Sequence, residues 1–217
     1  TGLGWTLHND ITVPYIVRYG SEEQKKKYLP LCITGELITA IAMTEPGAGS
    51  DLQGTHTTAV LDGDHYILNG SKTFITNGQK AGLVIVVAKT DTSAGSKGIS
   101  LFLVEADLPG FSKGKNLNKL GLKAQDTSEL FFQDVKVPKE NLLGEEGRGF
   151  IYLMQDLPQE RLSIAIGAVA NAKAVLESTV AYTKERKAFG TTVASFQNTQ
   201  FKLAEMSAEI DMAEVYT

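Results

Sequence analysis

A series of short apolar segments separated by turn residues is the feature that most constrains the fold of this chain. Asp62-Gly63 and Asn69-Gly70 are typical of hairpin turns, and no helical pattern lies between the segments. This spacing favours an antiparallel β-barrel or sandwich. The expected strands are residues 37–43, 55–61, 65–68, 72–76, 83–89, 99–105 and 129–138. Residues 113–127, which contain four lysines, are expected to form a loop or an irregular edge strand.

Helical patterns flank this strand-rich region. Ser21 followed by Gln24 is a capping-box start, for a helix that we expect Pro30 and Gly35 to end. Beyond residue 149 a helix carries apolar residues on so much of its circumference that we expect it to be buried, and a second amphipathic helix follows at 196–217. The first helix has the stripes Ala165, Val169, Ala172, Leu176, Val180 and Ile166, Ala170, Ala174, and the second has Phe201, Ala204, Ala208, Met212.

The stretch 41–51 joins an apolar strand to a turn rich in Pro, Gly, Ser and Asp. Gly47 and Gly49 permit a close approach of ligand to backbone, and Thr44 and Ser50 add hydroxyls, so the turn could hold a polar ligand. A tight surface turn explains the same residues. The dinucleotide fingerprint is excluded because Leu52 replaces its third Gly. The phosphate loop is excluded because Thr55 stands where it needs Lys.

Composition excludes several classes of function. A net charge of -4 argues against non-specific binding of nucleic acid. Cys32 is the one cysteine, which gives no disulfide framework, and with three scattered histidines it makes no metal-ligand spacing. We also expect no apolar run long enough to span a membrane. The sequence starts with Thr and stops within a helical pattern, so we expect it to be part of a longer protein.

Four motifs in order resemble the acyl-CoA dehydrogenase family, most of all its long-chain branch. They are Thr44-Glu-Pro-Gly-Ala-Gly-Ser-Asp51, Asn69-Gly-Ser-Lys-Thr-Phe-Ile-Thr-Asn77, Asp134-Val-Lys-Val-Pro138 and Glu185-Arg-Lys-Ala-Phe-Gly190. The resemblance implies an α+β multidomain fold. Residues 1–36 would end an N-terminal helical domain, 37–140 would form a middle antiparallel β-barrel, and 141–217 would begin a C-terminal helical bundle.

The resemblance also implies an FAD site. Because side chains two apart on a strand share a face, Phe74 and Thr76 could both face the flavin while Ile75 faces the core, although a plain amphipathic strand has the same pattern. Phe74 replaces the Trp often found in the family. The implied cofactor contacts are Ile41, Met43, Thr44, Gly49, Ser50, Phe74, Ile75, Thr76, Arg186 and Gln197. The last two would reach the FAD of a neighbouring subunit, which implies a homo-oligomer, dimer or tetramer.

Glu160 is the residue that the resemblance assigns as catalytic base. An acid in the first turn after Pro158 would also be explained by capping and the helix macrodipole. Pro158, Gln159, Arg161 and Ser50 would line the substrate site. Ser96 and Lys97, in a polar loop, are the candidates for contacts to CoA.

The implied reaction is α,β-dehydrogenation of a fatty acyl-CoA of medium to long chain to the trans-2-enoyl-CoA, as in β-oxidation. Electrons would leave through an electron-transfer flavoprotein, in the mitochondrial matrix or a bacterial cytoplasm. Two alternatives stay open at this point. An acyl-CoA oxidase would pass electrons to oxygen, and a catalytically silent relative would use the scaffold to bind protein or nucleic acid.

Overall fold

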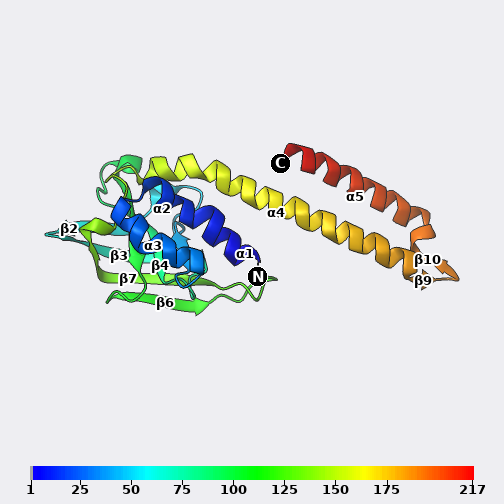
Figure 1. Ribbon diagram of the computed structural model, residues 1–217, viewed down its shortest axis with the longest axis horizontal. Coiled ribbons are helices and arrows are strands. Elements are labelled where there is room, and N and C mark those ends of the chain that lie inside the picture. The colour runs from blue at the N-terminus through cyan, green and yellow to red at the C-terminus, as the bar shows by residue number, and fades with distance from the viewer. Residues whose placement is uncertain (1) are drawn as a thin grey trace. The chain divides into compact units, whose positions relative to one another are not determined.

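The computed structural model describes residues 2–217, with side chains described from residue 4 onward. The chain divides into two compact units, Thr1–Leu157 and Pro158–Thr217. The long helix α4 (Gly149–Glu185) runs through the boundary between them. Figure 1 labels the elements of each unit.

Helices form the first part of the chain. α1 (Gly2–Thr6), a π-helical turn (Leu7–Thr12) and α2 (Val13–Tyr19) follow one another, and α3 (Glu22–Thr34) begins at the predicted cap. Both capping-box bonds are present, at 3.2 Å from Gln24 N to Ser21 Oγ and 3.0 Å from Ser21 N to Gln24 Oε1. The prediction that Pro30 ends this helix is wrong. Pro30 has no N–H, so the carbonyl of Lys26, four positions earlier, loses its helical hydrogen bond. Both residues are exposed, and water can bond to that carbonyl instead.

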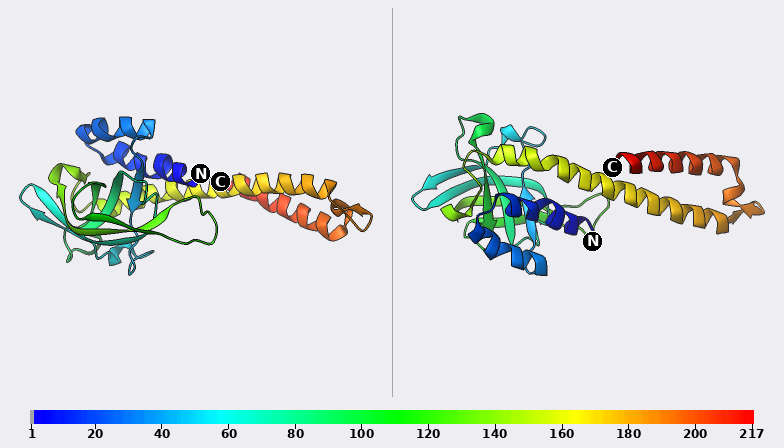
Figure 2. Two further views of the ribbon diagram at one scale, coloured as in Figure 1. Left: turned by 90° about the horizontal axis from the view of Figure 1, so that it is seen from below. Right: turned by 45° about the horizontal axis from the view of Figure 1, so that its top comes forward.

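The middle of the chain is an eight-stranded sheet that α1–α3 cover on one side (Figure 2), which confirms the predicted α+β class. The strands pair in the order β6-β7-β3-β2-β4-β5-β8, with β1 beside β4. Most pairs are antiparallel, but β1 pairs with β4 in parallel and β2 meets β4 in parallel at one position. The strands are β1 (Thr39–Ala42), β2 (Thr58–Asp62), β3 (His65–Thr76), β4 (Leu83–Lys89), β5 (Ile99–Glu105), β6 (Phe111–Asn116), β7 (Thr127–Pro138) and β8 (Leu142–Leu143).

Asn69-Gly70 is not a hairpin turn, and this prediction is wrong. β3 runs through both residues without a break, and its register against β7 shifts between Leu68 and Gly70. Gly70 has φ 149°, and a Cβ there would lie 2.4 Å from Thr57 Oγ1. Glycine is therefore required by a bulge and a close approach of two chain segments, not by a turn. By contrast, Asp62-Gly63 is a hairpin turn, as predicted, with Asp62 paired to His65.

The central strand β4 has an apolar sequence without alternation, and its surroundings in the sheet explain this pattern. Val84, Val86 and Ala88 pack in a core on one face of the sheet. Leu83, Ile85 and Val87 pack on the other face, in a core that includes Tyr15 and Tyr28 of the helices. Both faces of β4 are thus buried, which is the condition under which a strand is apolar throughout. The two cores position β1 and β3, which carry most of the candidate site.

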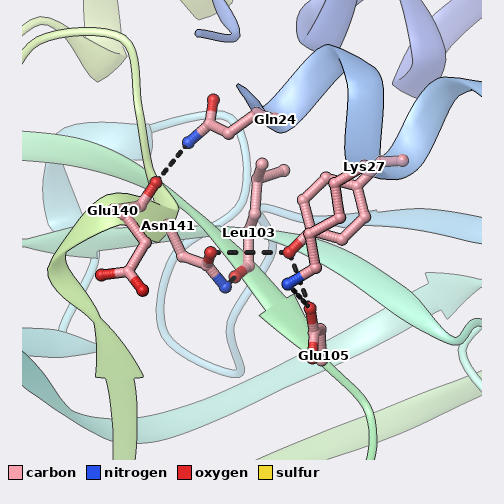
Figure 3. Close-up of polar contacts among 7 residues, drawn as sticks. Gln24, Lys27, Leu103, Glu105, Glu140 and Asn141 are labelled. Carbon is pink, nitrogen blue, oxygen red and sulfur yellow. Dashed lines mark hydrogen bonds and ion pairs between the residues drawn. The ribbon is translucent and has the colours of Figure 1, made fainter. Parts of the chain in front are cut away.

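A polar network fixes α3 on β5 (Figure 3). Tyr28 Oη donates to Glu105 at 2.7 Å, and Lys27 Nζ lies 2.6 Å from the same carboxylate. Burial and the Glu105 carboxylate raise the pKa of Tyr28 to about 12. Gln24 Nε2 donates to the carbonyls of Glu140 and Leu142 at 2.7 and 2.9 Å. These bonds anchor the helix to β5 and to the segment around β8, in addition to the apolar packing of Tyr28.

The second unit consists of most of α4, a hairpin of β9 (Lys187–Ala188) and β10 (Thr191–Thr192), and α5 (Gln197–Tyr216), which returns beside α4 (Figure 1). Lys173 and Glu214 join the two helices at 2.7 Å. The prediction that the first helix is buried is wrong here. Ile166 is 50% exposed, and on α5 Phe201 is 64% exposed, because one neighbouring helix covers only part of each circumference.

Within residues 2–217, α4 is the one helix that is long and apolar enough to cross a membrane by length and composition. The expectation that no apolar run reaches this length is therefore not confirmed. The core helix of a soluble helical bundle passes the same test. Length and composition alone do not distinguish a membrane-spanning helix from the core helix of a soluble bundle.

Candidate active site

The end of β1 and the end of β3 meet, and most of the predicted flavin contacts lie there. Thr73 N donates to the carbonyl of Thr44 at 2.9 Å. Lys72 Nζ donates to the carbonyl of Met43 at 3.0 Å. The fold thus brings the first two sequence motifs together, although they are separate in the chain.

Beneath this junction lies a buried ion pair that the sequence analysis missed. Lys72 Nζ is 2.8 Å from Glu45 Oε1, with side chains 0% and 4% exposed. The carboxylate also accepts bonds from the N–H groups of His56 at 2.7 Å and Thr57 at 3.0 Å. Burial lowers the pKa of Lys72 to about 8, against the opposing effect of Glu45. Burial raises the pKa of Glu45, but Lys72 and the hydrogen bonds outweigh it, so that the net shift is downward.

Phe74 occupies a bulge next to this pair. Its φ is 60°, and the register of β3 against β7 shifts between Lys72 and Ile75. A bulky residue in the left-handed region costs about 1–3 kcal/mol, so the surrounding bonds must hold it there. The ring is 66% exposed, whereas Ile75 is 3% exposed in the core and Thr76 is half-buried. The phenyl face is therefore free to contact a ligand.

Asn77, directly after Thr76, joins three parts of the first unit. Its Nδ2 donates to the carbonyls of Gly4 at 2.9 Å and Thr39 at 3.3 Å, and its Oδ1 accepts from Gln125 at 2.9 Å. Its φ of 62° is one that Asn tolerates better than most residues. No role was predicted for Asn77 from the sequence. A strand that ends in Asn-Gly was the signal for such a left-handed position.

The turn after Thr44 is closed on itself. Glu45 N donates to the carbonyl of Ala48 at 2.8 Å, and Ala48 N returns a bond of 3.2 Å to Glu45. Gly49 and Ser50 are exposed, and a Cβ on Gly49 would meet no atom within 4 Å. Open space beside a glycine and a hydroxyl fits the polar part of a nucleotide cofactor.

Ile41 and Ile75 behave differently from the other predicted cofactor contacts. Ile41 is 8% exposed in one core and Ile75 is 3% exposed in the other. Their side chains support the sheet, so a ligand could meet only their main-chain groups.

The predicted CoA contacts lie on a 3₁₀ turn, Gly95–Gly98, between β4 and β5. Ser96 is half-buried and Lys97 is exposed. This turn contacts the 3₁₀ turn Leu52–Gly54, which directly follows the Gly49 and Ser50 segment. The two predicted polar contact regions therefore belong to one part of the first unit.

Glu160 lies well inside α4, because the helix continues through Pro158 without a break. The expectation that Pro158 restarts a helix is wrong, and with it the explanation of Glu160 as a first-turn acid. Glu160 is 7% exposed, whereas Pro158, Gln159 and Arg161 are exposed. A buried carboxylate between exposed neighbours is unusual for a residue that only solubilises a helix.

Arg186 and Gln197 lie at one end of the second unit, on either side of the β9–β10 hairpin. Val193 N donates to the carbonyl of Arg186 at 2.8 Å, and Gln197 is the first residue of α5. Both side chains are exposed. They are accessible to a ligand or to another chain, and Arg186 also has the helix C-terminal position that favours a cation.

Comparison with known proteins agrees with the geometry. The family descriptions for the N-terminal, middle and C-terminal domains of acyl-CoA dehydrogenases match residues 1–36, 40–135 and 147–217. A mitochondrial long-chain specific acyl-CoA dehydrogenase from Sus scrofa is 58% identical over 218 residues, which cover 100% of this chain and 51% of the relative.

Two solved structures extend the comparison. An acyl-CoA dehydrogenase from Geobacillus kaustophilus matches with a TM-score of 0.97 and 60% identity, over 99% of this chain and 57% of that one. An acyl-CoA dehydrogenase from Bacillus anthracis, solved in complex with FAD, matches with a TM-score of 0.92 and 44% identity, over 98% of this chain and 36% of that one. The chain spans about half the length of the curated relatives it matches. On sequence and on structure, this chain belongs to the acyl-CoA dehydrogenase family.

Proposed function

We propose that the full-length protein containing this chain is an FAD-dependent dehydrogenase that converts a medium- or long-chain fatty acyl-CoA to the trans-2-enoyl-CoA. The observation that carries this proposal is the bond of 2.9 Å from Thr73 N to the carbonyl of Thr44, which joins the two motifs expected to contact the flavin. The identity of 58% to a long-chain specific relative supports the substrate class.

The first unit would hold the cofactor. FAD, when bound, supplies the acceptor for the hydride that leaves the substrate β-carbon. Phe74 is exposed, Thr44 and Thr76 are half-buried, and Gly49 and Ser50 form an open polar turn, so each could contact the cofactor. Ser96 and Lys97 would contact CoA.

Glu160 would remove the proton from the α-carbon of the thioester. An α-C–H is a weak acid, so the base must be held close to it and shielded from water. The burial of Glu160 suits this role, and the exposed Pro158, Gln159 and Arg161 are accessible to a substrate. Asp156, one turn earlier, is also buried and pairs with Arg18 of α2, which anchors the beginning of α4.

The partners are proposed on the same basis. Arg186 offers a fork of donors suited to a pyrophosphate, and with Gln197 it would contact the FAD of a second subunit in a homo-oligomer. Residues 1–36, 37–140 and 141–217 would be the three domain parts. The exposed apolar face of α4 would then be covered by further helices of the bundle rather than by lipid. An electron-transfer flavoprotein would accept the electrons, in the mitochondrial matrix or a bacterial cytoplasm.

The test is an anaerobic titration of the full-length protein, loaded with FAD, with butyryl-, octanoyl- and palmitoyl-CoA. We expect bleaching of the flavin absorbance, strongest with the longer chains. Glu160→Gln should keep bound FAD but lose bleaching, whereas Glu177→Gln, a control at an exposed position on α4, should bleach normally. Normal bleaching by Glu160→Gln would overturn the assignment of the base. Rapid peroxide formation in air would instead identify an oxidase.

A further inference from the structure

A contribution to folding stability does not explain why Lys72 and Glu45 form a buried ion pair. Removing two charges from water carries a penalty of several kcal/mol per ion, and well-packed apolar residues of similar size are often as stable or more so. Yet both side chains lie almost fully out of solvent, at 0% and 4% exposure. Leu130, which pairs with Lys72 across the sheet, belongs to the apolar core, so an apolar residue at position 72 would fit this neighbour.

The hydrogen bonds of the pair show what it does. Lys72 Nζ binds both the Glu45 carboxylate, at 2.8 Å, and the carbonyl of Met43, at 3.0 Å. It therefore holds the main chain before Thr44 and the side chain of the residue after it. The carboxylate in turn holds the N–H groups of His56 and Thr57, at the far end of the turn that contains Gly49 and Ser50.

The same lysine also borders the bulge on β3. Thr73, the next residue, makes the backbone bond to Thr44, and Phe74 follows with its φ of 60°. The Lys72–Glu45 pair therefore links the backbone before Thr44 to the segment after the Gly49–Ser50 turn, two residues from Phe74. No apolar residue could make the bond to the Met43 carbonyl.

We propose that Lys72 and Glu45 are positioning residues for the cofactor: their ion pair sets the spacing between Thr44 and the Phe74–Thr76 segment that receives the flavin. This inference rests on the proposed function. Neither side chain is exposed to a ligand, since both are buried.

The test compares FAD binding with folding in the full-length protein. The double variant Lys72→Met/Glu45→Gln removes both charges and keeps an acceptor for the turn N–H groups. We expect it to fold with a Tm near that of the wild type, to bind FAD about tenfold more weakly by flavin fluorescence, and to change the circular dichroism of the bound flavin. Glu45→Gln alone is the second variant. It leaves the buried ammonium of Lys72 without its counter-ion, so we expect it to weaken FAD binding at least as much and to lower Tm as well.

Two controls separate positioning from general stability. Lys27→Met removes a Lys–Glu pair between α3 and β5, away from the candidate site, and Val135→Ala opens a cavity in the core of the sheet. Both should leave the Kd for FAD and the flavin spectrum unchanged even where Tm falls. A wild-type Kd and spectrum in the double and single variants would overturn the positioning role while the proposed function stands. A wild-type protein that binds no FAD would overturn both.

Discussion

Asn77 accepts a hydrogen bond of 2.9 Å from Nε2 of Gln125, and this bond joins the residue after Thr76 to the loop before β7. The amide holds α1 and β1 as well, through the carbonyls of Gly4 and Thr39. The Asn77 side chain therefore ties the end of β3, where the predicted flavin contacts lie, to three other segments. Asn77 makes these bonds with its backbone in the left-handed region, at a φ of 62°.

Replacement of Asn77 should separate the contributions of side chain and backbone. Asn77→Gly keeps the φ of 62° accessible and loses the side-chain bonds, which we expect to lower the free energy of unfolding by about 2–3 kcal/mol. Asn77→Ala should lower it by roughly 1 kcal/mol more, because a Cβ disfavours this φ. Urea denaturation of the three proteins measures both steps. Equal stability of the Gly and Ala variants would show that the backbone is not strained.

A side chain at Gly70 should disrupt the close approach of β3 to Thr57, the residue before β2. In Gly70→Ala the new Cβ would lie 2.8 Å from Thr57 Cα, a backbone atom that cannot rotate away. We expect a loss of about 2–4 kcal/mol in the free energy of unfolding. Gly63→Ala is the matched control, because it also has a positive φ but nothing within 4 Å, and it should lose about 1 kcal/mol. A smaller loss at Gly70 than at Gly63 would contradict the close packing.

Lys72 should make stability depend on alkaline pH. Its pKa is lowered to about 8 in the native state from 10.5, so below pH 8 both states are protonated and the residue gives no slope. Between these values the unfolded chain binds more protons, and the free energy of unfolding should rise with pH, by at most about 1.4 kcal/mol per pH unit.

The measurement is the difference between the wild type and Lys72→Met/Glu45→Gln in urea denaturation from pH 7 to 10. Tyrosines whose pKa is raised in the native state, such as Tyr28, lower the free energy of unfolding of both proteins above pH 10. Their contribution therefore cancels in the difference. The difference should shift in favour of the wild type as pH rises through 8. A constant difference would mean that the lysine does not titrate there.

The hydroxyl of Tyr28 should contribute measurably to the attachment of α3. Tyr28→Phe removes a bond of 2.7 Å to Glu105, a charged acceptor that is partly shielded, and should lower the free energy of unfolding by about 1–2 kcal/mol. Tyr216→Phe, at a 90% exposed position, should have no effect. Thermal denaturation of both variants is sufficient, and an unchanged Tm for Tyr28→Phe would show that water replaces the bond.

Several features were predictable because they depend on neighbours in the chain. The capping box at Ser21, the hairpin at Asp62-Gly63 and the strand β5 follow from residues only a few positions apart. The continuous apolar run of β4 likewise predicted a buried strand. The motifs predicted the family because they sample many such local requirements at once.

Other features were decided by contacts between distant segments. Asn69-Gly70 has the composition of a turn, yet pairing with β7 and the approach of Thr57 make it a bulge. Pro30 and Pro158 have the composition of helix ends, yet both helices continue. In each case the residue four positions earlier is exposed, so water can reach the carbonyl that the proline leaves without a partner.

By itself the sequence determined the helix–sheet–helix order, the family and the residues expected to carry the chemistry. Only the tertiary structure decided which of them meet. It paired Lys72 with Glu45, joined Thr73 to Thr44 and buried Glu160 between exposed neighbours. The physical reason is that the energy of a buried charge or an inter-strand bond depends on a partner far along the chain, which no local pattern specifies.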